Sequence, residues 1–353
     1  MQLEKYQKLV IESLKKYILV CDIKSVSMLT PDASSRLYFR IELVAESLPN
    51  RLIAMLFLST KSPESGGSVS VCSDQAVMQL GKFLYQNDIS VPEIFYQDLE
   101  HSIILIEDLG DISLAESFQT HKNIDYYKAA IDQILKIQNI KPEQDFFPYK
   151  REFGFKQYRL ELDEILDFSL INITAVERDE LSKQFDKLSN QLNLLPKVLV
   201  HRDFHSWNLM LDRNNKIRVI DYQDALMATK YYDLVALLND RDTDQILGEQ
   251  CYLSLLEYYY YKIDKPEKFL EQYCLISLQR DLKVVGRFSK LDQIKIGANY
   301  SKWIPGTLKR VARTLDFLGP EYQVMKNILT IYYPDYFSSA HLIELSKLKL
   351  RQN

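Results

Sequence analysis

One stretch of the sequence, VLVHRDFHSWNLML at residues 198–211, constrains the fold more than any other. It places eight polar or aromatic side chains between two apolar ends. A second apolar run, IRVI, is followed directly by Asp221, thirteen positions after Asn208. Each apolar run predicts a short buried strand. A turn between two such strands would bring Asp203, Asn208 and Asp221 together, so the sequence predicts a cluster of carboxylate and amide oxygens.

Oxygen atoms of this kind suit a hard cation. Asn208 and Asp221 offer the ligands that Mg²⁺ prefers, and Mg²⁺ commonly binds phosphates. Asp203 beside them would accept a proton from an attacking hydroxyl or orient that hydroxyl. A metal, a carboxylate and accurate positioning are what phosphoryl transfer requires. The competing interpretation is that Asp203 and Asp221 are ordinary turn residues, because Asp and Asn are common in turns.

The hydrophobic periodicity divides the chain into two parts near residue 110. Before it, the pattern predicts two amphipathic helices, at 4–19 and 74–87, and a five-stranded antiparallel sheet. The strands are expected at 25–30, 36–44, 51–59, 92–98 and 101–110. After it, the helical period dominates, at 123–138, 154–168, 174–193, 244–262, 266–288 and 307–318. We therefore expect an α+β, bilobal architecture with a small antiparallel β-rich N-terminal lobe, 1–108, and a larger α-helical C-terminal lobe, 109–353.

The composition and the sequence pattern argue against several classes of binding partner. A net charge of −4 argues against a nucleic-acid-binding protein. No apolar run approaches the roughly 18 residues of a membrane span, and the charged N-terminus is unlike a signal peptide. The four cysteines lie far apart, which favours buried thiols over zinc or disulfides. We expect a cytoplasmic monomer without a nucleic-acid or membrane partner.

The order H-R-D-x-x-x-x-N, followed by an Asp at the end of an apolar strand, resembles the catalytic loop and metal-binding Asp of the protein-kinase superfamily. His205 and the sequence VIDYQDA at 219–225 shift the resemblance to the aminoglycoside phosphotransferase and choline kinase branch. Within this branch, the chain is similar to bacterial anomeric amino-sugar kinases of cell-wall recycling, which phosphorylate N-acetylmuramate and N-acetylglucosamine at O1. The stretches that carry the resemblance are 29–41, 103–111, 198–210, 219–241 and 279–291.

The resemblance implies a role for each polar residue of the loop. Asp203 is the catalytic base or the carboxylate that orients the hydroxyl, and Asn208 and Asp221 hold Mg²⁺. His201 and His205 brace the loop through hydrogen bonds, or are simply structural imidazoles.

Two more acidic residues and the link between the lobes have other expected roles. Asp224 and Asp233 are expected to be structural, and Asp233 would cap the helix that contains LVALL. The backbone of Glu107, Asp108 and Leu109 would face the adenine of ATP.

The turn that should cover the phosphates departs from the family pattern. TPDASSR, at 30–36, contains no glycine. Backbone amides and the hydroxyls of Ser34 and Ser35 would cradle the phosphate instead. Strand alternation places Arg36 and Arg40 on one face of their strand, where they either point at the site or form a solvated surface.

The sequence also lacks the ion pair by which protein kinases position ATP. The strand 51–59 has no Lys, and the helix 74–87 has no Glu. The absence of both partners leaves no buried charge alone. We therefore expect Arg36 or Arg40, or less plausibly Lys61, to neutralise the α- and β-phosphates.

Together these features predict a small-molecule kinase that uses ATP and Mg²⁺ and acts on an amino sugar at its anomeric hydroxyl, in peptidoglycan recycling. Two alternatives stay open: a phosphotransferase of the same fold with an aminoglycoside, choline or another metabolite as acceptor, or a catalytically silent nucleotide-binding scaffold. An aminoglycoside site would gather carboxylates, because that substrate is a polycation, whereas the expected acceptor segment 150–168 carries both signs of charge.

Overall fold

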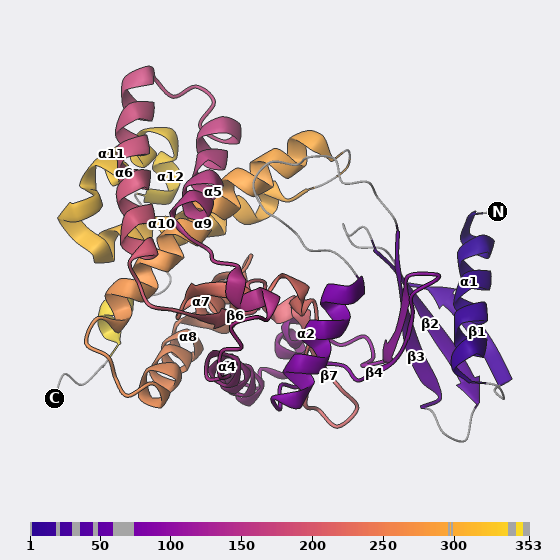
Figure 1. The fold of residues 1–353 in the computed structure, drawn as a ribbon. Helices are drawn as coiled ribbons and strands as arrows, with labels where there is room; N and C mark the ends of the chain where they lie inside the picture. The colour runs from indigo at the N-terminus through magenta and orange to yellow at the C-terminus, as the bar shows by residue number, and fades with distance from the viewer. Residues whose placement is uncertain are drawn as a thin grey trace. The chain divides into compact units, whose positions relative to one another are not determined.

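The computed structural model describes residues 2–18, 22–29, 36–44, 49–58, 74–295, 297, 299–337 and 344–348. The chain forms two compact units. We call Met1–Ser113 with Asn208–Asp224 the sheet unit, and Leu114–Trp207 with Ala225–Asn353 the helical unit. Strands dominate the first part of the chain and helices the second (Figure 1), which confirms the predicted α+β class.

The sheet unit is built on five antiparallel strands in the order β1-β2-β3-β5-β4. Their bounds are β1 Asp22–Met28, β2 Arg36–Val44, β3 Arg51–Phe57, β4 Ile94–Asp98 and β5 Ile103–Glu107. Helix α2, Asp74–Gln86, is inserted between β3 and β4. A small hairpin of β7, Leu209–Leu211, and β8, Ile217–Val219, also belongs to this unit. The predicted five-stranded sheet is confirmed.

Alternation along β2 separates the apolar core from the polar face. Phe39 and Ile41 are fully buried and pack with Val10 and Leu14 of helix α1, Gln2–Tyr17. Because neighbouring side chains of a strand point to opposite faces, the even-numbered residues of β2 face away from α1. The two arginines of this strand therefore lie on the side of the sheet opposite to α1.

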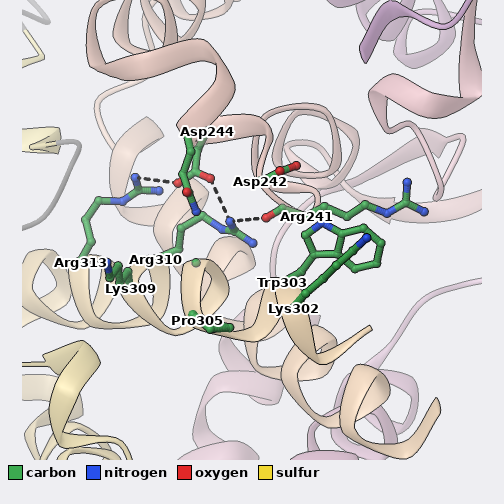
Figure 2. A pocket seen from close by; sticks show the side chains of 11 residues that line it. Arg241, Asp242, Asp244, Lys302, Trp303, Pro305, Lys309, Arg310 and Arg313 are labelled. Carbon is green, nitrogen blue, oxygen red and sulfur yellow. Dashed lines mark hydrogen bonds and ion pairs between the residues drawn. The ribbon is translucent and has the colours of Figure 1, made fainter. Parts of the chain in front are cut away.

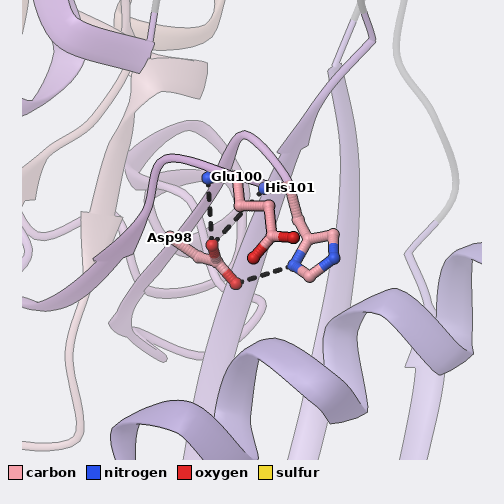
Figure 3. A group of neighbouring side chains, drawn as sticks. All are labelled: Asp98, Glu100 and His101. Carbon is pink, nitrogen blue, oxygen red and sulfur yellow. Dashed lines mark hydrogen bonds and ion pairs between the residues drawn. The ribbon is translucent and has the colours of Figure 1, made fainter.

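A cluster of ionisable groups ties α1 to the turn between β4 and β5. Asp98, Glu100 and His101 lie close enough together to suggest a metal site (Figure 3). However, Nζ of Lys16 lies 2.6 Å from Oε2 of Glu100 and 3.2 Å from Oδ2 of Asp98. Burial opposes the ionisation of Asp98, but hydrogen bonds from His101 and Lys16 outweigh it and lower the pKa to about 2. The cluster already contains its cation, and we assign it to stability.

The helical unit contains ten α-helices within the described residues, and the six expected from the sequence are confirmed. Those six are α4 Asp125–Gln138, α5 Phe155–Phe168, α6 Ala175–Asn193, α8 Thr243–Lys262, α9 Phe269–Ile294 and α10 Ile304–Leu318. The others are α3 Leu114–His121, α7 Tyr232–Asn239, α11 Gln323–Tyr332 and α12 Pro334–Phe337. A short antiparallel pair, β6 Lys197–Val200 and β9 Leu226–Thr229, supports the loop that begins at His201.

Helices α5 and α9 approach each other closely at Gly286. A Cβ atom at this position would collide with the backbone of Glu164 and Ile165. Since residues three or four apart share a helix face, this contact also brings Glu161 of α5 next to Lys283 of α9. Gly286 therefore sets how closely Glu161 and Lys283 approach each other one helical turn away.

Two further expectations concern cysteines and membranes. Cys251 and Cys274 are free thiols, and Cys274 is buried, whereas Cys21 and Cys72 lie outside the described residues. Among the helices that the structure describes, none has the length and apolar character needed to cross a bilayer.

Candidate active site

The loop that begins at His201 is held by a carboxylate from another part of the helical unit. The backbone N–H groups of His201 and Arg202 donate hydrogen bonds to Asp233, at 2.7 and 2.9 Å. Asp233 lies in the first turn of α7, and the N-cap of that helix is Tyr231. The expectation that Asp233 caps the helix is therefore wrong: its two oxygens hold the loop instead. Arg202 adopts a left-handed φ of 81°, which is uncommon for a residue with a side chain.

Both histidines of the loop contribute to its packing. His201 is 1% exposed, and its ring meets that of the fully buried Phe204 edge-on at 5.4 Å. The backbone N–H of His205 donates to the carbonyl oxygen of Asp203 at 3.0 Å. Burial lowers the pKa of His205, so this imidazole is neutral at pH 7.

Asp203 lies among three positive charges. Burial opposes its ionisation, but the charges of Lys283, Arg202 and Arg280 outweigh that effect and lower the pKa of Asp203 to about 2. Nη1 of Arg280 also lies 3.5 Å from the carbonyl oxygen of Arg202. This carboxylate is consequently ionised at every physiological pH.

Helices α5 and α9 supply the polar groups around this carboxylate. Nζ of Lys283 lies 3.5 Å from Oε1 of Glu161, and Nε2 of Gln279 donates to Oε2 of Glu161 at 3.1 Å. Burial lowers the pKa of Lys283, although the charge of Glu161 raises it. From the sequence, Glu161 is expected only as part of the acceptor segment 150–168, and no individual role is predicted for Gln279 and Lys283. For Gln279 and Lys283, the signal in the sequence is that polar and charged residues interrupt the buried stretch of α9, which is unusual for a buried helix.

Asp221 is linked to Arg36 within the sheet unit. Nη2 of Arg36 lies 2.8 Å from Oδ1 of Asp221, and Nη1 donates to Oε1 of Gln223 at 3.1 Å. Nε2 of Gln223 in turn donates to the same oxygen of Asp221 at 3.0 Å. Arg36 is 6% exposed, so the predicted cation of β2 is directed to the predicted metal ligand and away from solvent.

Asn208 and Asp221, the two expected metal ligands, belong to adjoining backbone segments. The N–H of Ile220 donates to the carbonyl oxygen of Asn208 at 3.1 Å. Asp221 has a left-handed φ of 65°, and its side chain is 36% exposed. A carboxylate and an amide oxygen, with one of the side chains reachable from solvent, fit a hard divalent cation.

Side chains at the end of β5 are held by arginines. Arg40 pairs with Asp108 and Asp111, each at 2.8 Å, and Arg218 donates to Glu107 at 2.9 Å. Hydrogen bonds and charge from Asp111 and Asp108 raise the pKa of Arg40. Arg40 thus serves to fix the segment after β5.

The structure describes only some of the other residues that the sequence predicts to contact ATP. Leu109 is buried, with 7% of its surface exposed. Ser34, Ser35 and Lys61 lie outside the described residues. The roles of Glu107, Asp108 and Leu109 in holding adenine stay predictions.

Comparisons with known proteins identify the family of the chain. Residues 35–268 match the phosphotransferase enzyme family. The chain is 29% identical over 287 residues to an N-acetylmuramate/N-acetylglucosamine kinase of Neisseria meningitidis serogroup B, covering 75% of this chain and 85% of that protein. A protein of the same name from Pseudomonas aeruginosa is 29% identical over 216 residues, covering 58% of this chain and 62% of the relative.

A solved structure shows the same fold. The structure of spectinomycin phosphotransferase in complex with ADP and spectinomycin aligns with a TM-score of 0.59 at 14% identity, over 92% of this chain and 98% of the other. At this identity the likeness concerns the fold, and it confirms the fold that the resemblance implied. Since the family match covers more than half of the sequence, the chain belongs to the phosphotransferase enzyme family and is a phosphotransferase of the kinase type.

Proposed function

We propose that this protein is a kinase that uses ATP and Mg²⁺ and transfers the γ-phosphate to the anomeric hydroxyl of an amino sugar, N-acetylmuramate or N-acetylglucosamine. The feature that carries the proposal is the carboxylate of Asp203 in its loop, on which the positive charges of Lys283, Arg202 and Arg280 act. The relatives named as kinases of these two sugars support the choice of acceptor.

The low pKa of Asp203 determines how it would act. A carboxylate with a pKa of about 2 is a weak base, so it would not remove a proton from a free hydroxyl in advance of phosphoryl transfer. It would accept a hydrogen bond from the hydroxyl and orient the oxygen towards the phosphorus. In a loose transition state the hydroxyl becomes acidic as the P–O bond forms, and the proton would then pass to Asp203.

The sheet unit would bind the other reactant. Asn208 and Asp221 would hold Mg²⁺, which when bound neutralises phosphate charge and orients the nucleotide. Arg36, already directed to Asp221, would supply the positive charge that protein kinases take from a strand lysine. Arg40 is less suited to this role, because Asp108 and Asp111 neutralise it.

A panel of acceptors tests the proposal. Purified protein is incubated with ATP, Mg²⁺ and N-acetylmuramate, N-acetylglucosamine, kanamycin or choline, and phosphorus NMR identifies the product. A sugar phosphate esterified at O1 is expected. Turnover of kanamycin or choline alone would reassign the acceptor, and ATP binding without turnover of any compound would indicate a silent scaffold.

A further inference from the structure

The helical unit contains a cavity of about 660 Å³ beside the first turns of α8 and α10 (Figure 2). Its volume falls within the range of small-molecule sites. Five of the residues that line it are basic and two are acidic. The eleven lining residues are Arg241, Asp242, Asp244, Gln245, Lys302, Trp303, Pro305, Gly306, Lys309, Arg310 and Arg313.

Two of the five cations are neutralised by buried carboxylates. Asp244 lies between the guanidinium groups of Arg310 and Arg313 (Figure 2), with N–O distances of 2.9 and 3.7 Å. Arg310 also pairs with Asp281 at 3.2 Å. These four groups carry two charges of each sign, so they contribute no net charge to the cavity.

The remaining cations leave the cavity electropositive. Nε of Arg241 lies 3.7 Å from Oδ2 of Asp240, outside the lining. Lys302 and Lys309 face one further acid in the lining, Asp242. Within the described part of the chain, Lys309 forms no ion pair, and its side chain is exposed. An exposed ammonium next to a buried, balanced network is available to a ligand, and a net positive lining selects anions.

Arg241 connects the cavity to the catalytic loop. Its guanidinium lies 5.4 Å from the ring centroid of Trp207 and 5.0 Å from that of Trp303. Trp207 belongs to the loop that carries Asp203, and Trp303 lines the cavity. The charges of Asp203 and Arg241 both act on His205. The cavity therefore begins within one layer of side chains of the loop.

We propose that this basic cavity binds a carboxylate of the acceptor, so that the enzyme prefers N-acetylmuramate, with its lactyl carboxylate, to the uncharged N-acetylglucosamine. The inference rests on the proposed function and specifies its substrate class. The cations would hold the lactyl group, while the anomeric hydroxyl, at another position of the ring, remains available to Asp203.

Steady-state kinetics with both sugars test this assignment. Lys309→Gln should lower kcat/KM for N-acetylmuramate about tenfold, the loss of one charge-assisted contact, and should leave N-acetylglucosamine within about twofold. The double variant Lys302→Gln with Lys309→Gln should lower kcat/KM for N-acetylmuramate further. Lys268→Gln, at an exposed lysine of the same unit outside the cavity, is the matched control. Equal losses for both sugars, or a wild-type enzyme without preference, would overturn the inference.

Tryptophan fluorescence separates this inference from the proposed function. The sequence contains two tryptophans, and both contact Arg241, so titration without nucleotide reports on the cavity directly. N-acetylmuramate should change the emission of the wild-type protein at lower concentration than N-acetylglucosamine or inorganic phosphate, and Lys309→Gln should weaken the response. This result would support the cavity even if no sugar were phosphorylated. An equal response to phosphate, or no response to N-acetylmuramate, would contradict it.

Discussion

Arg36 and Asp221 form an ion pair in which Nη2 and Oδ1 are 2.8 Å apart. Arg36→Ala removes a nearly buried cation from the proposed phosphate side. We expect the Kd for ATP with Mg²⁺ to rise about tenfold or more, since the contact is charge-assisted. Calorimetric titration measures this. Arg51→Ala, which removes an exposed pair with Glu42 on the same sheet, should leave the affinity unchanged. An unaltered Kd for Arg36→Ala would contradict the role given to this residue.

We expect Lys283 to act as a positioning residue for Asp203, and the pH dependence of kcat/KM should show its effect. The charge of Lys283 helps to lower the pKa of Asp203 to about 2, so this carboxylate produces no acid limb in the kcat/KM profile above pH 4. Lys283→Met removes the charge, raises the pKa of Asp203 and moves an acid limb to higher pH. Lys290→Met is the matched control, because Lys290 pairs with Glu164 between the same two helices. Identical profiles for wild type and Lys283→Met would rule out this electrostatic role.

Asp233 fixes the backbone of the catalytic loop through two acceptor oxygens. Asp233→Asn keeps the shape but turns one acceptor into a donor, which leaves a buried N–H without its partner. We expect an unfolding free energy lower by about 1–3 kcal/mol and a lower kcat with a nearly unchanged KM for ATP. Urea denaturation and steady-state kinetics measure the two effects. The control Asp264→Asn, at an exposed position of the same unit, should change neither the unfolding free energy nor kcat. A normal kcat for Asp233→Asn would show that the loop does not need these two hydrogen bonds.

Gly286 allows α5 and α9 to approach each other. Gly286→Ala forces a Cβ atom against the backbone of Glu164 and Ile165, and overpacking of this kind costs about 1–3 kcal/mol. At Gly306, also within a helix, the added Cβ meets mainly the flexible amide of Gln245. Gly306→Ala should therefore leave stability unchanged or raise it, as alanine favours helix. Chemical denaturation compares the two, and equal midpoints would mean that the helices adjust to the added atom.

The fold and the loop motif were predictable because their signals are local. Short apolar runs bounded by turn residues marked the strands, and the spacing of Asp203, Asn208 and Asp221 marked the loop. The short α3, with eight residues, spans too few turns to display a period. Lys283 and Glu161 meet across 122 positions of the sequence, and no local pattern encodes such a contact. The same reason explains the error at Asp233, whose side chain reaches a backbone segment 31 to 32 residues earlier.

The central claim is that Asp203 orients an amino-sugar hydroxyl during phosphoryl transfer. The most direct measurement is the turnover of N-acetylmuramate by the wild-type enzyme and by Asp203→Asn at saturating ATP and Mg²⁺, with the Kd for ATP determined in parallel. We expect kcat to fall by about 10³-fold, a typical loss for a proton-accepting carboxylate, while the Kd for ATP stays within about twofold. Retention of more than a tenth of the wild-type kcat by Asp203→Asn would contradict the account.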